Sequence, residues 1–246
     1  MTGGASGIGL AIAKALGADG ASVVIADIDG DRAFTAAESI PGAVHRQADV
    51  SDADACRQVV RSTIGELGRL DILVNNAGLQ HVAPVVDFPE ERWIQLVSTM
   101  LIGPFVLTRA ALPGMIERRW GRIINIGSIH SLVASPNKSA YVSAKHGLLG
   151  LTRTVSLEVG EHGVTCNLIA PGYVRTALVE GQIADQARTL DIPESEVLER
   201  VMLGPSAVRR LIEPEEVAAY ARFLCTDAAA SITGAAQVID GGWTAR

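Results

Sequence analysis

Short, mostly apolar runs alternate along the chain with longer stretches whose apolar positions recur at helical spacing. Several of the short runs are almost continuously apolar, which is typical of strands in a parallel sheet covered by helices on both faces. We therefore predict strands over residues 21–27, 43–49, 70–78, 121–128, 163–172 and 235–242. The stretches between them predict helices over Ile8–Leu16, Gly30–Ser39, Asp52–Leu67, Glu90–Glu117, Ser139–Gly160 and Pro214–Cys225.

Strands that alternate with helices predict βαβ units. The expected fold is therefore α/β, with a Rossmann-type doubly wound parallel sheet. A chain of 246 residues allows one large domain or two small ones, and we expect a single domain over residues 1–246. Residues 173–211 depart from the alternation of strands and helices, because they are helical but more polar than the core helices and contain Pro193, Gly204 and Pro205. Their place after a strand end favours a substrate lid; a surface insertion without function is the alternative.

The chain begins "MTGGASGIGL", so only Met1 and Thr2 precede a glycine-rich loop that normally follows a β-strand. That strand, expected at the centre of the sheet, is absent from the sequence as written. Its absence would leave two neighbouring strands with unpaired backbone groups. We expect a start codon placed too late; a gapped or rearranged sheet is the alternative.

Composition excludes some classes of function. The net charge of −6 argues against a nucleic-acid binder, which needs a basic surface. No run approaches the ~20 apolar residues of a membrane span, and no signal peptide precedes the loop. The three cysteines have no metal-binding spacing, which predicts no metal site and a reducing compartment. We expect a cytoplasmic protein without a membrane partner.

The glycine loop itself predicts a phosphate site. Gly3, Gly7 and Gly9 permit close approach of the backbone to phosphate, and the helix that follows offers free N–H groups to a pyrophosphate. Asp27 ends the next strand, where a carboxylate can accept both hydroxyls of an adenosine ribose and repel a 2′-phosphate. This pattern favours NAD over NADP. Asp49 closes the following strand and could face the adenine.

A candidate catalytic group lies in the second half of the chain. Tyr141 and Lys145 are four residues apart on one face of a predicted helix. An ammonium beside a phenol lowers the pKa of the phenol, which makes Tyr141 usable as a general acid/base. Ser128, at the end of a predicted strand, offers a hydroxyl to a substrate oxygen.

Together, the loop TGxxxGIG, the sequence NNAG at residues 75–78, Ser128, Tyr141-x-x-x-Lys145 and Pro171-Gly172 resemble the short-chain dehydrogenase/reductase family along the whole chain. The resemblance implies reversible hydride transfer between a nicotinamide dinucleotide and an alcohol or ketone, in a homotetramer. Tyr141 would move the hydroxyl proton, Lys145 would tune Tyr141 and hold the ribose, and Ser128 would position the carbonyl. The expected cofactor site comprises Gly3, Ser6, Gly7, Ile8, Gly9, Asp27, Asp49, Val50, Asn76, Ala77, Gly78, Tyr141, Lys145, Pro171, Gly172, Val174 and Thr176.

One position departs from the family pattern. Met100 stands where the family usually has an asparagine that supports a water-mediated proton relay. Methionine cannot make that hydrogen bond. The relay is therefore held by water and backbone, or proton exchange with solvent is slower.

Further stretches, such as "HSLVASPNKSAY" and the ending "DGGWTAR", resemble members of the family that act on a small hydroxy acid and its keto acid. Lys138 and His130 lie close in sequence to Tyr141 and Ser128, and a carboxylate is bound well by cationic and amide donors. The expected substrate site comprises Gln80, Ser128, His130, Lys138, Tyr141, Gln182 and Trp243. The alternatives are an enzyme of the same family with another substrate and a catalytically impaired NAD-binding protein that forms oligomers.

Overall fold

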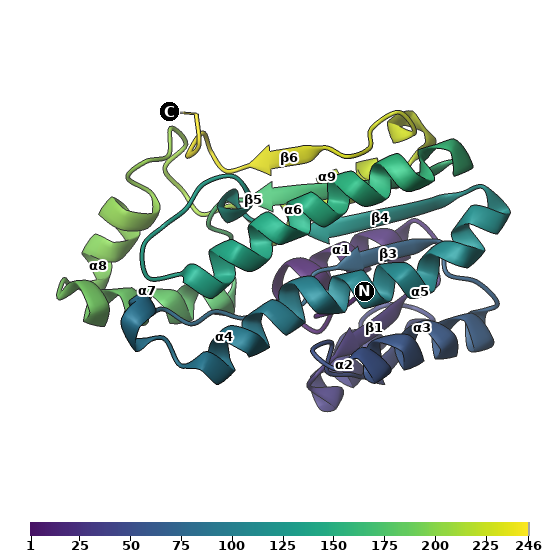
Figure 1. Cartoon of the computed structure of the whole chain (residues 1–246), viewed down its shortest axis with the longest axis horizontal. Coiled ribbons are helices and arrows are strands. Elements are labelled where there is room, and N and C mark those ends of the chain that lie inside the picture. Colours follow the sequence, from purple (N-terminus) through teal and green to yellow (C-terminus); the bar gives the residue numbers. More distant parts are fainter. Residues whose placement is uncertain (246) are drawn as a thin grey trace.

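Parallel strands form the central layer of the computed structural model, which describes residues 1–245 (Figure 1). The predicted strands are all present and somewhat shorter than the apolar runs. Their bounds are β1 (Val24–Asp27), β2 (Val44–Gln47), β3 (Ile72–Asn75), β4 (Gly121–Ile126), β5 (Val164–Pro171) and β6 (Ala236–Ile239). β1 pairs with β2, and β3, β4, β5 and β6 pair in that order, always in parallel.

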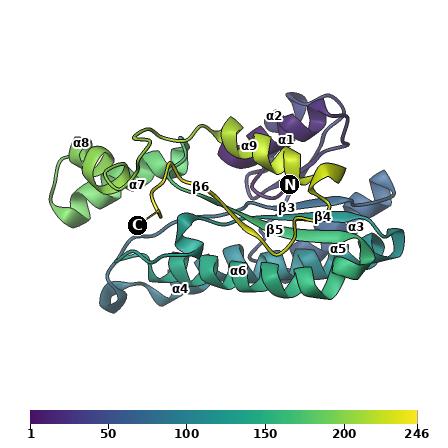
Figure 2. The ribbon, with the colours of Figure 1, turned by 90° about the horizontal axis from the view of Figure 1, so that it is seen from above.

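Helices cover both faces of this layer, as Figure 2 shows from above. One face carries α1 (Gly7–Ala18), α2 (Gly30–Glu38) and α9 (Pro214–Leu224), and the other carries α3 (Ala53–Leu67), α5 (Gly103–Arg118) and α6 (Ser139–Val159). The α/β fold with a doubly wound parallel sheet is thus as predicted. Every residue of β4 and β5 is buried, which explains why these strands are apolar without alternation.

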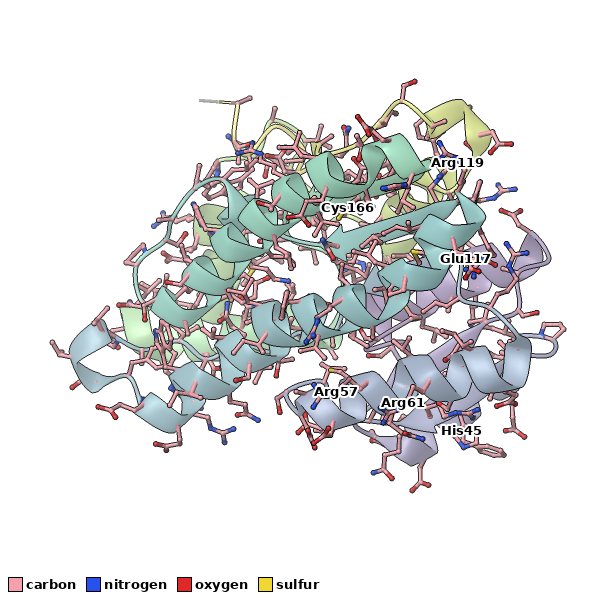
Figure 3. The ribbon with its side chains drawn as sticks, turned by 45° about the vertical axis from the view of Figure 1, so that its right-hand side comes forward. His45, Arg57, Arg61, Glu117, Arg119 and Cys166 are labelled. Atoms are coloured by element: carbon pink, nitrogen blue, oxygen red, sulfur yellow. The ribbon has the colours of Figure 1, made fainter. Side chains whose placement is uncertain are left out.

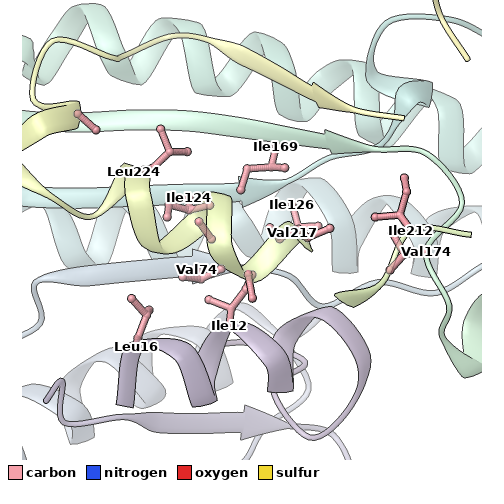
Figure 4. Packing of buried hydrophobic residues seen from close by; sticks show 13 residues of the cluster. Ile12, Leu16, Val74, Ile124, Ile126, Ile169, Val174, Ile212, Val217 and Leu224 are labelled. Atoms are coloured by element: carbon pink, nitrogen blue, oxygen red, sulfur yellow. The ribbon is translucent and has the colours of Figure 1, made fainter. Parts of the chain in front are cut away.

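The two faces hold separate apolar clusters. On one face, Ile12 and Leu16 of α1 and Val217 of α9 pack over Val74 and Ile124 of the sheet (Figure 4). On the other face, side chains of α3, α5 and α6 cover β3, β4 and β5, with Cys166 fully buried among them. Arg57 and Arg61 of α3 and Glu117 of α5 lie on the helices of this face (Figure 3).

Met1 and Thr2 lie between β1 and β3, where the sheet is interrupted. The backbone of Thr2 pairs with Ala26 on one side, and its N–H donates to the carbonyl of Val74 on the other. Among the described residues, β1 and β3 do not pair with each other directly, so the strands are divided into the sets β1–β2 and β3–β6.

The predicted helix Glu90–Glu117 is not uniform. It consists of α4 (Glu90–Val97), a wider π-helical turn η2 (Ser98–Ile102) and α5. Pro104 has no N–H to donate to the carbonyl of Met100, and the N–H of Gly103 donates instead to Ser98, five residues earlier. This proline accounts for the wider turn, which periodicity alone did not reveal.

The whole helical run Glu90–Arg118 is long and apolar enough to span a membrane by length and composition, with a mean hydropathy of 1.4 over 18 residues. Continuous apolar runs in the sequence alone predict no such segment. In the fold, α5 packs on β3 and β4 and against α3, as the core helix of a compact protein does.

Residues 173–211 form a separate helical segment at one end of the molecule (Figures 1 and 2). It contains α7 (Ala177–Leu190), α8 (Glu194–Glu196) and a π-helical turn η5 (Val197–Met202). Val179, Val197, Met202 and Leu211 give this segment an apolar cluster of its own. Its first helix, α7, lies at the carboxyl ends of the strands, beside the site described next.

Candidate active site

The N-terminus of α1 opens onto a cleft of about 360 Å³. Ser6 precedes the helix without capping it through its side chain, so the first amides of α1 remain available to an anion. Gly3 and Gly7 have positive φ values of 57° and 52°, which disfavour any other residue. A Cβ at Gly9 would lie 2.2 Å from the carbonyl oxygen of Gly3, so this glycine allows the loop to pack onto the helix. The loop is thus shaped for phosphate, by backbone rather than by side chains.

Asp27 lines the same cleft. Its two carboxylate oxygens accept hydrogen bonds from the backbone N–H groups of Ala5 (3.1 Å) and Asp29 (3.2 Å). These bonds fix the carboxylate on the cleft wall and leave lone pairs free for further donors. Asp49 also lines the cleft, with one oxygen accepting from the backbone and hydroxyl of Ser51.

Ser128, Tyr141 and Lys145 meet where the sheet and α6 converge. The Tyr141 hydroxyl is hydrogen-bonded to Ser128. The Lys145 ammonium donates to the carbonyl oxygen of Ile126 at 2.7 Å and lies 5.6 Å from the centre of the Tyr141 ring. Tyr141 and Lys145 line the cleft, and Tyr141 and Ser128 line a smaller pocket beside it. Tyr141 therefore stands between the two spaces.

Burial dominates the proton affinities of this group. It raises the pKa of Tyr141, with the hydrogen bond to Ser128 acting in the opposite direction, and it lowers the pKa of Lys145 to about 8. The expected lowering of the pKa of Tyr141 by Lys145 is not found in this structure. The physical reason is that Lys145 is directed to Ile126 and lies over the ring rather than beside the hydroxyl, while both groups are desolvated.

The smaller pocket has a volume of about 80 Å³ and contains a buried cation. Lys138 is 4% exposed, and its ammonium lies 3.4 Å from the Oε1 atom of Gln182 and 5.6 Å from the centre of the Tyr173 ring. No carboxylate of the described residues is within ion-pair distance of it. Burial accordingly lowers the pKa of Lys138 to about 8. The pocket thus holds a positive charge without a protein counterion.

His130 is the second titratable group in the smaller pocket. Burial, reinforced by the nearby charge of Lys138, lowers the pKa of His130 to about 4, so the ring is neutral near pH 7. Its Nδ1 atom lies 3.2 Å from the carbonyl oxygen of Val133. Because a carbonyl can only accept, Nδ1 carries the proton and Nε2 is left as an acceptor.

The predicted site residues fall into these two spaces with few exceptions. Of the expected cofactor residues, Gly9 lines neither space, and Pro171, Gly172 and Val174 line the smaller pocket instead of the cleft. Of the expected substrate residues, only Trp243 is absent from the wall of the smaller pocket, although its ring centre lies 6.4 Å from that of His130. The remaining predicted residues line the cleft or the pocket.

Sequence reasoning missed several lining residues. Tyr173 borders the smaller pocket, Thr99 borders the cleft, and Leu178 borders both. The position of Tyr173, directly after Pro171-Gly172 and before Val174, is the one signal that could have revealed it. Met100 is 1% exposed and packs with Leu96, Ala140 and Ala144. It therefore contributes apolar packing behind Tyr141 and no polar group.

Comparison with known proteins gives full-length matches. A family model described as enoyl-(acyl carrier protein) reductase matches residues 3–244. A D-beta-hydroxybutyrate dehydrogenase of Rhizobium meliloti (strain 1021) is 47% identical, with 100% of this chain and 98% of the relative aligned. A second one, from Cupriavidus necator, is 44% identical over 100% and 97%. An uncharacterized oxidoreductase, YxjF of Bacillus subtilis, is 42% identical over 100% and 97%.

Proposed function

The chain belongs to the short-chain dehydrogenase/reductase family, and from this premise we propose that it interconverts (R)-3-hydroxybutyrate and acetoacetate, with NAD as the partner in hydride transfer. The chain is an oxidoreductase, and its relatives at 44–47% identity bear the name of an enzyme that acts on this hydroxy acid. The substrate, the nucleotide and the roles of the residues are the content of the proposal.

The observation that carries the proposal is the buried ammonium of Lys138. A desolvated charge without a counterion is costly, and a substrate carboxylate would remove that cost by forming a charge-assisted hydrogen bond. Gln182 would donate its amide N–H to the same carboxylate while its Oε1 atom holds the ammonium. The pocket volume of about 80 Å³ suits a small acid rather than a long acyl chain.

Tyr141 would exchange the hydroxyl proton of the substrate. In the direction of oxidation, the C3–H bond breaks as a hydride leaves, the hydroxyl proton passes to the Tyr141 oxygen, and a carbonyl forms. Ser128, which is hydrogen-bonded to Tyr141, would hold the substrate oxygen in place. To accept this proton Tyr141 must be a phenolate, which the nearby positive charge of Lys145 would favour against the opposing effect of burial.

The residues of the cleft fit a dinucleotide. The uncapped N-terminus of α1 and the glycines at positions 3 and 7 would hold the pyrophosphate, and the fixed carboxylate of Asp27 would accept the hydroxyls of the adenosine ribose. Asp49 and Val50 would border the adenine, and residues 76–78 would border the chain of the cofactor between the two ends. Bound NAD supplies the acceptor for the hydride. A carboxylate at position 27 disfavours the additional phosphate of NADP.

Assembly and location remain predictions. Ile94, Ile102 and Phe105 expose apolar surface on the Glu90–Arg118 helical run, and Leu157 does so on α6. Such exposed side chains support the expected homotetramer, because an interface would bury them. The mass of the protein in solution, measured by light scattering, tests this expectation. A cytoplasmic location is likewise expected from the sequence and is tested by cell fractionation.

Formation of NADH from NAD and each enantiomer of 3-hydroxybutyrate tests the proposal directly. We expect turnover of the (R) enantiomer and little of the (S) enantiomer, with NAD preferred over NADP. A secondary alcohol without a carboxylate, 2-butanol, serves as the control for the role of the acid group. Oxidation of 2-butanol but of neither enantiomer would refute the substrate assignment, and NAD binding without turnover of any alcohol would favour a catalytically impaired protein.

A further inference from the structure

The ammonium of Lys138 is held by two residues of the helical segment 173–211. Gln182 of α7 accepts a hydrogen bond from it through Oε1, at 3.4 Å. The Lys138 nitrogen also lies over the ring of Tyr173, 5.6 Å from the ring centre. All three residues line the smaller pocket. The segment that borders the pocket therefore also fixes the place of the cation inside it.

Tyr173 is itself fixed through its backbone and its side chain. Its carbonyl oxygen accepts a hydrogen bond from the N–H of Ile212 at 2.9 Å, and the next residue, Val174, forms a parallel bridge with Ile212. The side chain packs against the apolar cluster of the segment, which includes Val179 and Met202. The ring is thus part of a packed unit and presents a face to Lys138 from a fixed position.

A ring face suits an ammonium that has no counterion. Burial, and then the proximity of Tyr141, raises the pKa of Tyr173 to about 12, so Tyr173 is uncharged near pH 7. The attraction is therefore between a cation and the electron-rich face of a neutral ring, and it is stronger when both groups are desolvated. An ammonium has three N–H donors, and Gln182 takes one of them, which leaves donors for a carboxylate.

We propose that Tyr173 is a positioning residue of the substrate site, whose ring face holds the Lys138 ammonium beside Gln182 so that its remaining N–H donors face the substrate carboxylate. This inference rests on the role of Lys138 in the proposed function. The lysine side chain is a flexible stem of four carbons, so without the ring the bound acid would have to fix the ammonium itself. Holding the ammonium in advance lowers that entropic cost and raises the affinity for the acid.

Two substitutions separate the ring face from the hydroxyl. Tyr173→Phe keeps the ring, whereas Tyr173→Leu removes it. Tyr220→Leu, on α9 and outside both the cleft and the pocket, is the matched control for the loss of a tyrosine. Initial rates are measured with (R)-3-hydroxybutyrate and with 2-butanol. Tyr173→Leu should raise KM for the acid about tenfold, and kcat and the activity on 2-butanol should change less than about twofold. Tyr173→Phe and Tyr220→Leu should keep the native KM within about twofold.

A double-mutant cycle tests whether the effect passes through Lys138. In the Lys138→Met background, Tyr173→Leu should lower kcat/KM for the acid no further. Tyr173→Met, which lacks a ring but is unbranched, repeats the comparison independently of how well leucine packs. A tenfold loss that persists without Lys138, an equal loss on acid and alcohol, or a loss in Tyr173→Phe as large as in Tyr173→Leu would overturn the proposal.

The native protein separates this proposal from the one on which it rests. Absence of native turnover of (R)-3-hydroxybutyrate would refute the proposed function, and the role of Tyr173 with it. Native turnover of the acid with an unchanged KM in Tyr173→Leu would overturn the role of Tyr173 alone and leave the proposed function standing.

Discussion

Replacing Lys138 with methionine removes the buried charge while nearly preserving the shape of the side chain. Lys138 is 4% exposed and has Gln182 as its one hydrogen-bond partner among the described residues, so the substrate carboxylate would be its main electrostatic partner. Loss of one partner of a buried charge pair costs about 3 kcal/mol, or about 150-fold in kcat/KM for (R)-3-hydroxybutyrate. The same substitution at Lys14, which is exposed on α1, is the matched control and should change kcat/KM by less than about twofold.

The assay follows NADH absorbance with the acid and with 2-butanol, which lacks the carboxylate, for the native protein and both variants. Lys138→Met should lose activity on the acid and keep its activity on the alcohol, so the preference for the acid should nearly vanish. The affinity for the cofactor, measured as NADH binding by fluorescence, should not change. An equal loss on both substrates would mean that Lys138 supports the fold or Tyr141 rather than the carboxylate, and the reasoning would be refuted.

Three further predictions concern other residues. Asp27→Ser should raise kcat/KM with NADP by at least about tenfold relative to NAD, because a like charge near the 2′-phosphate is removed; an unchanged ratio would remove Asp27 from ribose selection. Tyr141→Phe should lower kcat by about 10³-fold with NADH binding retained, and substantial turnover by this variant would exclude Tyr141 as the acid/base. Burial lowers the pKa of His130 from 6.5 to about 4 in the folded protein. Because the unfolded chain binds the proton at higher pH than the folded protein, the free energy of unfolding should fall by about 3 kcal/mol as the pH drops from 6.5 to 4. Thermal unfolding of His130→Gln at both pH values should show a smaller loss, and an equal loss would contradict the assignment.

The strands and helices were largely predictable because their burial is regular. β4 and β5 are buried along their whole length, and a strand that is covered on both faces must be apolar without alternation. The division of the Glu90–Glu117 helix was not predictable from periodicity. It depends on one missing hydrogen bond at Pro104, which leaves the apolar pattern unchanged.

Much of the candidate site was also accessible from the sequence, since Tyr141 and Lys145 share a helix face and Ser128 ends the adjacent strand. What the sequence did not give is the environment of these groups. Burial raises the pKa of Tyr141. The nearby Lys145 does not reverse this effect, because its ammonium donates to the carbonyl of Ile126 rather than to the Tyr141 hydroxyl. Tyr173 was missed because an aromatic residue in a loop has no pattern that identifies it as a partner of Lys138.

The order of apolar runs, glycines and a few polar residues determined the α/β class, the phosphate loop and the residues of the catalytic group, because each depends on local spacing along one element. Tertiary structure alone decided which charges lose their water and their counterions, since that depends on side chains from elements far apart in sequence.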